Sequence, residues 1–127
     1  MRVRLFIKAV FALLLVAMLP GCATLDRQSR ARFVGDWIYA DKIQSCRYSF
    51  SADGSFHGEV KYNAATVSRF TGRWAVKESA LLYTYLGDEF GRIPAGATDR
   101  DQVLEVGKDS FLIRAANGER RRYRRIR

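Results

Sequence analysis

The last eight residues contain the densest group of charges in the chain, because six of them are arginines. If residues 120–127 form a strand, Tyr123 lies on one face with Arg121 and Arg125, and three further arginines lie on the other. A guanidinium donates two parallel hydrogen bonds to a carboxylate, and it does so more strongly in a dry cavity. The segment therefore predicts an anion-binding arginine and tyrosine, an arginine stacked on an aromatic ring, or a solvated cationic edge.

His57 is the only histidine, so any histidine-based catalysis would depend on it. The alternation of residues 55–62 places His57 with Glu59 and Lys61 on a polar strand face, where a solvated side chain is expected. The chain has no G-x-S-x-G nucleophile motif, no CxxC pair and no recognisable spacing of paired acids. We therefore expect a protein that is not an enzyme and uses no metal or cofactor, with a hydrolase as the distant alternative.

The first 22 residues have the pattern of an export signal. Three cations stand within residues 1–8, an apolar run of eleven residues occupies positions 9–19, and Pro-Gly-Cys follows. Eleven helical residues span only about 17 Å, against ~30 Å for the hydrocarbon core of a bilayer, so a permanent transmembrane helix is the weaker interpretation. We expect residues 1–21 to be removed.

Leu19-Pro20-Gly21-Cys22 resembles the lipobox of bacterial lipoproteins, in which an aliphatic residue, a small residue and Gly or Ala precede a cysteine. Pro20 departs from the usual small residue. The resemblance implies that diacylglycerol is joined to the Cys22 thiol, that the signal is cut before Cys22 and that the new amino group is acylated. Several acyl chains, at about 0.8 kcal/mol per buried CH₂, then anchor the chain to a membrane. Ala23 resembles the outer-membrane sorting pattern; an ordinary secretory signal is the alternative.

Removal of residues 1–21 takes away three cations and leaves 19 lysines and arginines against 13 acids, a net side-chain charge of +6. In the bacterial cell envelope, nucleic acid is not an available partner. The positive surface therefore predicts contact with anionic lipid head groups, lipopolysaccharide phosphates or an acidic protein. A merely soluble arginine-rich surface is the alternative.

Cys46 has no intramolecular partner if Cys22 is a thioether, because the chain has two cysteines. We expect Cys46 to be a small buried apolar residue. An intermolecular disulfide site is the alternative.

Short alternating segments separated by turn residues fill the chain from Phe33 onward, and no helical period extends beyond about ten residues. Asp53-Gly54 and Asn117-Gly118 are hairpin signals, because these residues tolerate the positive φ of tight turns. Sequential hairpins predict an all-β, up-and-down antiparallel meander that curls into a barrel to protect its edges. The predicted strands are Phe33 to Tyr39, Ser45 to Phe50, Ser55 to Tyr62, Thr66 to Lys77, Leu81 to Leu86, Gln102 to Val106, Phe111 to Ala115 and Arg120 to Ile126.

A short F-x-G-x-W motif occurs twice, at residues 33–37 and 70–74. Together with the hairpin at residues 50–56 and the Arg/Tyr-rich last strand, it makes residues 33–127 resemble the lipocalin-like small β-barrels. The resemblance implies an eight-stranded antiparallel barrel whose interior can hold an apolar ligand. It also implies that an arginine late in the chain packs across Trp37 and closes the barrel. Separately, Arg121-x-Tyr123 resembles the arginine and tyrosine pair with which fatty-acid-binding barrels hold a ligand carboxylate.

These observations divide the chain into a signal peptide (1–21), a lipidated cysteine with a tether (22–32) and a barrel domain (33–127). We expect a non-enzymatic lipoprotein of the outer membrane that acts as a binding module. One hypothesis is a cavity for a small apolar or anionic amphiphile; the other is a filled interior whose outer surface recruits an envelope protein in a structural or assembly role. The long polar segment 87–100 is either a surface loop or a cap in which Phe90 and Ile93 cover the barrel mouth. The predicted cavity wall is Trp37, Phe56, Tyr62, Phe70 and Trp74, with Arg121, Tyr123 or Arg125 as polar anchor.

Overall fold

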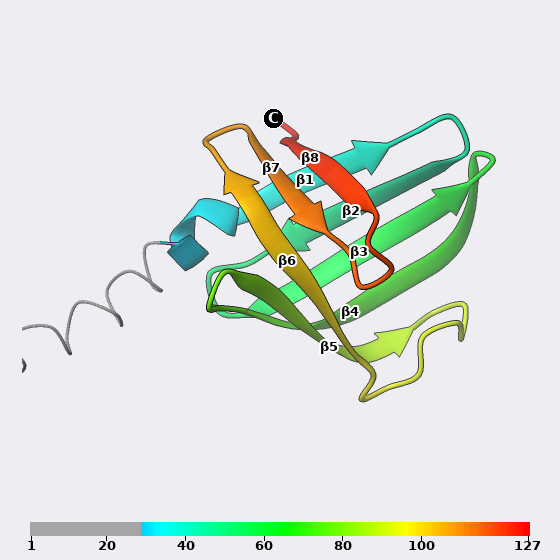
Figure 1. The fold of residues 1–127 in the computed structure, drawn as a ribbon. Coiled ribbons are helices and arrows are strands. Elements are labelled where there is room, and N and C mark those ends of the chain that lie inside the picture. The colour runs from blue at the N-terminus through cyan, green and yellow to red at the C-terminus, as the bar shows by residue number, and fades with distance from the viewer. Residues whose placement is uncertain (1–28) are drawn as a thin grey trace, which may run out of the picture.

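Alternating inward and outward side chains build eight strands, in the order that the sequence pattern predicts (Figure 1). The computed structural model describes residues 29–127. The predicted signal peptide, Cys22 and the start of the tether lie outside these residues. The strands are β1 (Gly35–Ala40), β2 (Gln44–Phe50), β3 (Ser55–Tyr62), β4 (Ala65–Lys77), β5 (Ala80–Asp88), β6 (Thr98–Val106), β7 (Ser110–Arg114) and β8 (Arg120–Arg125).

Each strand pairs antiparallel with its sequence neighbours, and β8 returns to β1, so the sheet is a closed up-and-down barrel. The closing seam is short, because only two residue pairs join β1 to β8, Trp37 with Arg125 and Ile38 with Arg124. Closure removes the free sheet edges that would otherwise pair with other chains. The predicted all-β meander and its closure are confirmed.

A helical turn at residues 29–33 precedes β1 and blocks one end of the barrel. The Phe33 side chain is 1% exposed and packs edge-on against Phe111, with ring centroids 5.1 Å apart. The Trp37 indole donates a hydrogen bond of 2.8 Å to the Phe33 carbonyl oxygen. The first strand therefore begins at Gly35 rather than at Phe33.

No helix among residues 29–127 is long and apolar enough to span a bilayer.

The irregular segment between β5 and β6 is shorter than the sequence predicts, because β5 continues to Asp88 and β6 begins at Thr98. The Asp88 carboxylate organises this loop by accepting hydrogen bonds from the Ser68 hydroxyl and from backbone N–H groups, including that of Ile93. Burial opposes its charge, but these hydrogen bonds lower the pKa of Asp88 to about 2. Ile93 packs partly buried against the core, whereas Phe90 is 49% exposed.

The two ends of the barrel differ. The helical turn and the turns β2–β3, β4–β5 and β6–β7 lie at one end, which we call the closed end. The connections β1–β2, β3–β4, β5–β6 and β7–β8 lie at the other, which we call the mouth. Ser29, the first described residue, also lies at the closed end (Figure 1).

Candidate functional site

Aromatic rings fill most of the barrel interior. The Tyr48 ring is the hub of this packing, because its centroid lies 5.6 Å from those of Phe50, Phe70 and Tyr123. Ring pairs at such distances add about 0.5–1.5 kcal/mol each beyond the burial of their surface. Gly58 makes room for this packing, because a Cβ there would overlap the Phe70 ring. The rings leave the middle of the barrel filled rather than hollow.

Four of the five residues predicted as a cavity wall belong to this packed interior. Trp37, Phe56, Phe70 and Trp74 are each at most 4% exposed, and each packs against another aromatic ring. They surround other side chains, not an open calyx.

Tyr62 is not part of the packed interior, so that prediction is wrong. Its side chain is 52% exposed. The ladder between β3 and β4 shifts register after Val60, and Tyr62 is the last residue of β3, next to the turn at Asn63 and Ala64. The extra residue of this irregularity, Val67, lies on β4, and β3 stays in register with β2 through Tyr62, so Tyr62 is exposed because it stands at the end of its strand.

A polar pocket of about 280 Å³ remains at the mouth, above the packed rings. Its walls come from β2, β6, β7, β8 and the β7–β8 turn, and it combines phenols, carboxylates and one guanidinium. The lining residues are Tyr48, Asp99, Asp101, Ile113, Ala115, Ala116, Asn117, Arg121 and Tyr123.

Asp101 supplies a buried carboxyl group to this pocket. Its side chain lies on β6, is 8% exposed and accepts a hydrogen bond of 2.9 Å from the Tyr83 hydroxyl. Burial raises the pKa of Asp101 and neighbouring Asp99 adds to the shift, while the Tyr83 hydrogen bond and Arg121 oppose it, and the resulting pKa is about 6. The group therefore changes from acceptor-only carboxylate to hydrogen-bond donor in a mildly acidic range.

Arg121 supplies the cation, from the inner face of β8. One terminal nitrogen donates a hydrogen bond of 2.9 Å to Glu119, and the guanidinium lies 5.3 Å from the centre of the Tyr39 ring. Burial opposes its charge, but the Glu119 hydrogen bond and the nearby phenol and thiol groups outweigh burial and raise the pKa of Arg121. Its Nε is buried and has no hydrogen-bond partner within the described part of the chain. Such an orphaned donor costs about 1–3 kcal/mol until it finds an acceptor.

Tyr123 lies two residues beyond Arg121 on the same face and lines the same pocket. Its ring stacks on Phe111 with centroids 4.9 Å apart, and burial raises the pKa of its hydroxyl. Burial likewise raises the pKa of Tyr48 and of Tyr83. The phenol hydroxyls are thus neutral hydrogen-bond donors. The pocket can hold a ligand with acceptor oxygens near Arg121 and donor groups near Asp101.

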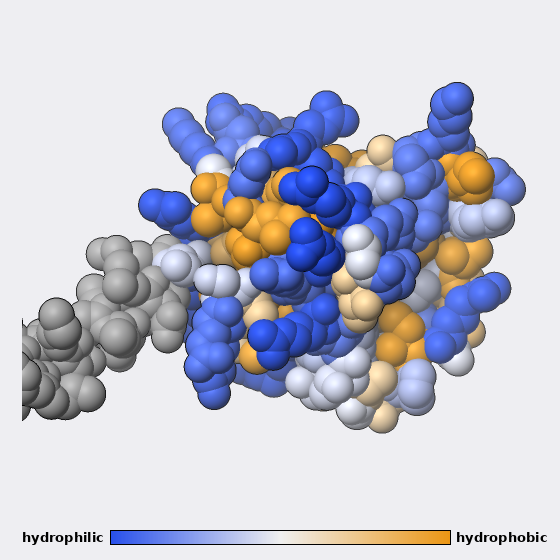
Figure 2. Space-filling view, viewed as in Figure 1, coloured by the Kyte–Doolittle hydropathy of each residue, from blue (hydrophilic) through white to orange (hydrophobic). Residues whose placement is uncertain are grey.

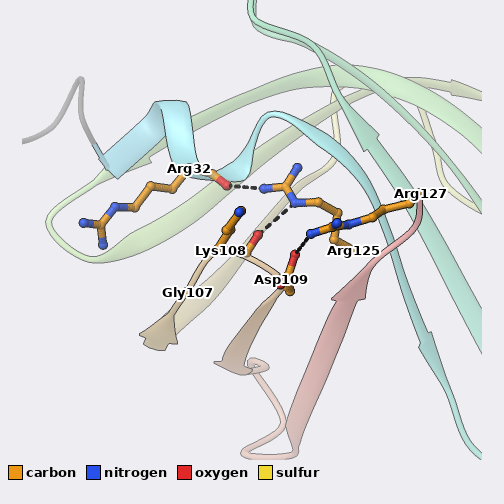
Figure 3. Close-up of a pocket in the computed structure, with 6 residues that line it drawn as sticks. All are labelled: Arg32, Gly107, Lys108, Asp109, Arg125 and Arg127. Atoms are coloured by element: carbon orange, nitrogen blue, oxygen red, sulfur yellow. Dashed lines mark hydrogen bonds and ion pairs between the residues drawn. The ribbon is translucent and has the colours of Figure 1, made fainter.

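Arg125 lies at the closed end and takes no part in the mouth pocket. Its guanidinium stacks over the Trp37 ring at 4.1 Å from the centroid and donates to backbone carbonyl oxygens of Val34, Arg32 and Lys108. The arginine packed over Trp37, which the resemblance to lipocalin-like barrels implies, is therefore Arg125. Figure 3 shows the hydrogen bonds from Arg125 to Arg32 and Lys108.

His57 is exposed on the outer face, as its parity predicts, and it lines a surface groove of about 520 Å³ with Glu59 and Arg69. Cys46 is 3% exposed, and burial raises the pKa of its thiol. No group of three ligating side chains within residues 29–127 is placed to hold a metal ion.

Sequence reasoning missed one phenol and both carboxyl groups of the mouth pocket, which belong to Tyr48, Asp99 and Asp101. The alternation of β2 signals an inward Tyr48, because Cys46 and Phe50 share its face. No comparable signal exists for Asp99 and Asp101, because their strand begins inside the polar segment that the sequence presents as a loop.

The fold is that of the lipocalin-like barrels. A search of solved structures matches the chain to a lipocalin-like protein from Bacteroides uniformis, with a TM-score of 0.56 and 18% sequence identity over 75% of this chain and 99% of that protein. At this identity the match concerns the fold alone. No protein-family model matches the chain, and no curated protein is similar to it in sequence.

Proposed function

We propose that the protein is a lipid-anchored, non-enzymatic binding module of the outer membrane, and that it holds a small ligand in the mouth pocket. The observation that carries this proposal is the buried Nε of Arg121, which has no hydrogen-bond partner among residues 29–127 and lies in a pocket that also contains a buried carboxyl group. A ligand oxygen is a suitable partner for that nitrogen, because guanidinium bonds to anionic oxygens are the strong ones.

The pocket selects for a compact polar group. Its volume of about 280 Å³ is at the lower limit of ligand pockets, which typically range over roughly 300–1,000 Å³. The packed rings around Tyr48 occupy the part of the barrel interior in which a long apolar tail would have to lie. The ligand that fits is a small carboxylate, phosphate or carbonyl compound with its acceptor oxygen at Arg121 and a donor group at Asp101.

The anchor part of the proposal rests on the sequence of residues 1–22. Acylation of Cys22 would attach the chain to the membrane a few residues before the helical turn at residues 29–33. The binding role rests on the pocket, and neither part requires a chemical step on the ligand.

The second candidate is an accessory envelope protein that works through its outer surface. The filled interior favours it, because a barrel packed with rings needs no ligand for stability. The two candidates differ in what Arg121 does: it contacts a ligand in the first and is only a structural cation in the second.

Native mass spectrometry of the full chain, purified from envelopes in detergent, tests the binding role. We expect a copurifying small molecule, or binding from a panel of short carboxylates and phosphate monoesters, and we expect Arg121→Gln to weaken binding at least about tenfold. Arg114→Gln is the matched control, because Arg114 is exposed on neighbouring β7. Absence of any bound molecule, or equal binding by the Arg121 variant, would refute the ligand role and favour the accessory one.

A further inference from the structure

Cations gather at the closed end of the barrel, around the β6–β7 turn and the end of β8. Figure 3 shows the hollow between these segments, which has a volume of about 700 Å³. A second hollow of about 720 Å³ adjoins it along the outer face of β8 and is lined by Arg122 and Arg124. We call this surface the basic face; its cations are Arg32, Lys108, Arg122, Arg124, Arg125 and Arg127.

The basic face has one carboxylate among its lining residues, Asp109, which pairs with Arg127. Arg125 is held by the Trp37 ring and by backbone carbonyl oxygens, so it contributes charge but is not free to move. Arg32, Lys108 and Arg124 are exposed, and none of them forms an ion pair with any carboxylate of residues 29–127. Three cations therefore remain available for anionic oxygens outside the molecule.

The chain that leads to Cys22 enters at this same end. Ser29 is the first described residue of the helical turn, and the six residues 23–28 separate Ser29 from Cys22. Even fully extended, the seven steps from Cys22 to Ser29 reach only about 25 Å, at ~3.5 Å per step. A lipid on Cys22 would therefore hold the basic face close to the bilayer, where an anionic surface attracts cations within a Debye length of about 8 Å.

Apolar surface borders the cations. Figure 2 shows an apolar patch over the ends of β6 and β7 nearest the closed end, surrounded by hydrophilic side chains. Leu104 and Val106 of β6 are both partly exposed. A surface that combines cations with a modest apolar patch suits the interface between head groups and acyl chains.

We infer that the basic face docks on anionic lipid head groups of the membrane that carries the anchor, with lipid phosphate oxygens in the hollow beside Arg32 and Lys108. The mouth lies at the opposite end of the barrel, so docking turns the pocket of Arg121 and Asp101 away from the membrane, toward ligands in the surrounding compartment. This inference rests on the lipid anchor of the proposed function.

Two lysines of the native chain test the docking. Lys108 lies in the basic face and Lys42 in the β1–β2 turn at the mouth, and both are exposed. The lipidated full-length protein is reconstituted on two kinds of vesicle, one of phosphatidylcholine alone and one of phosphatidylcholine and phosphatidylglycerol at about two to one. A water-soluble amine-acylating reagent then labels both lysines. On the anionic vesicles we expect labelling of Lys108 to slow roughly fivefold and that of Lys42 to stay unchanged, with the difference lost at high salt.

Charge reversal identifies the surface. Arg32→Glu with Arg124→Glu should abolish the protection of Lys108, whereas Arg92→Glu with Arg120→Glu, two exposed cations at the mouth end, should leave it intact. Equal labelling of Lys108 on both kinds of vesicle, or protection of Lys42 instead, would overturn the docking.

Flotation separates the docking from the anchor. Flotation with neutral vesicles reports the lipid anchor, so a chain that floats with them but shows no protection of Lys108 has an anchor and no docking. A chain that floats only with anionic vesicles and protects Lys108 has the docking without the anchor. A chain that floats with neither contradicts both.

Discussion

Asp101 should make the stability of the barrel depend on pH in a direction unusual for a carboxyl group. Its pKa is raised from 3.8 to about 6 by burial, so the folded state holds its proton more tightly than the unfolded state does. Stability from this group is fully present below the unfolded pKa and is lost as the pH rises through about 6. A shift of about two units corresponds to about 3 kcal/mol in total, of which about 2 kcal/mol falls between about pH 4.5 and 7.5.

Asp101→Asn should remove this dependence, because the amide keeps an acceptor for the Tyr83 hydroxyl but cannot ionise. Urea unfolding followed by tryptophan fluorescence at several pH values between about 4.5 and 7.5 measures it. We expect the wild-type free energy of unfolding to fall by about 2 kcal/mol relative to the variant over this range. Carboxyl groups with lowered pKa values, such as Asp88, lose their stabilising effect only at lower pH.

Two further variants separate Asp101 from other causes. Tyr83→Phe removes the hydrogen bond that lowers the pKa of Asp101, so the loss of stability should extend to higher pH. Glu78→Gln, in the exposed β4–β5 turn, should leave the pH dependence unchanged. Parallel pH profiles for the wild type and Asp101→Asn would refute the assignment of a buried carboxyl group to the mouth pocket.

Three other predictions concern the packing of the barrel. Arg125→Ala should lower the free energy of unfolding by about 2–4 kcal/mol, because it removes the stacking on Trp37 and leaves carbonyl oxygens without donors. Arg122→Ala, which breaks only an exposed ion pair, should lower it by less than about 1 kcal/mol. Equal effects of the two substitutions would contradict the role of Arg125. Gly72→Ala should destabilise by at least about 2 kcal/mol in denaturant unfolding, because its Cβ would overlap the backbone of β5, while Gly87→Ala, which has open space, should stay within about 1 kcal/mol of wild type. The Cys46 thiol should react with a disulfide reagent only at the rate of unfolding, and fast labelling of the folded chain would show that it is accessible.

Strand positions were predictable because side-chain parity and turn chemistry are local. The hairpin at Asp53-Gly54 needs a positive φ that glycine tolerates, and Gly54 has a φ of 93°. Parity also placed Arg121 and Tyr123 together, and the structure brings both to one pocket. Parity does not predict at which end of the barrel a residue lies. Arg121 and Arg125 share one face of β8 but lie at opposite ends of the barrel.

The remaining differences arise from pairing between distant segments. Tyr62 is exposed because β3 ends there, beside the turn at Asn63 and Ala64, and the end of the strand is set by its pairing with β4 and not by parity. The start of β6 at Thr98 depends on pairing with Thr84 in β5, although its own residues are polar and have weak strand preference. Asp101 is buried only because the barrel closes around it, so its raised pKa has no signal in the local sequence.

The Nε–Hε resonance of Arg121 tests the central claim most directly. A ¹⁵N-labelled full-length chain is titrated with acetate and, separately, with inorganic phosphate, and the arginine Nε–Hε signals are followed by NMR. The orphaned donor should shift downfield and saturate as it gains an oxygen acceptor, ahead of the signal of exposed Arg114. An Arg121 signal that stays in place, or that moves only in step with Arg114 without saturating, would contradict a ligand site at the mouth of the barrel.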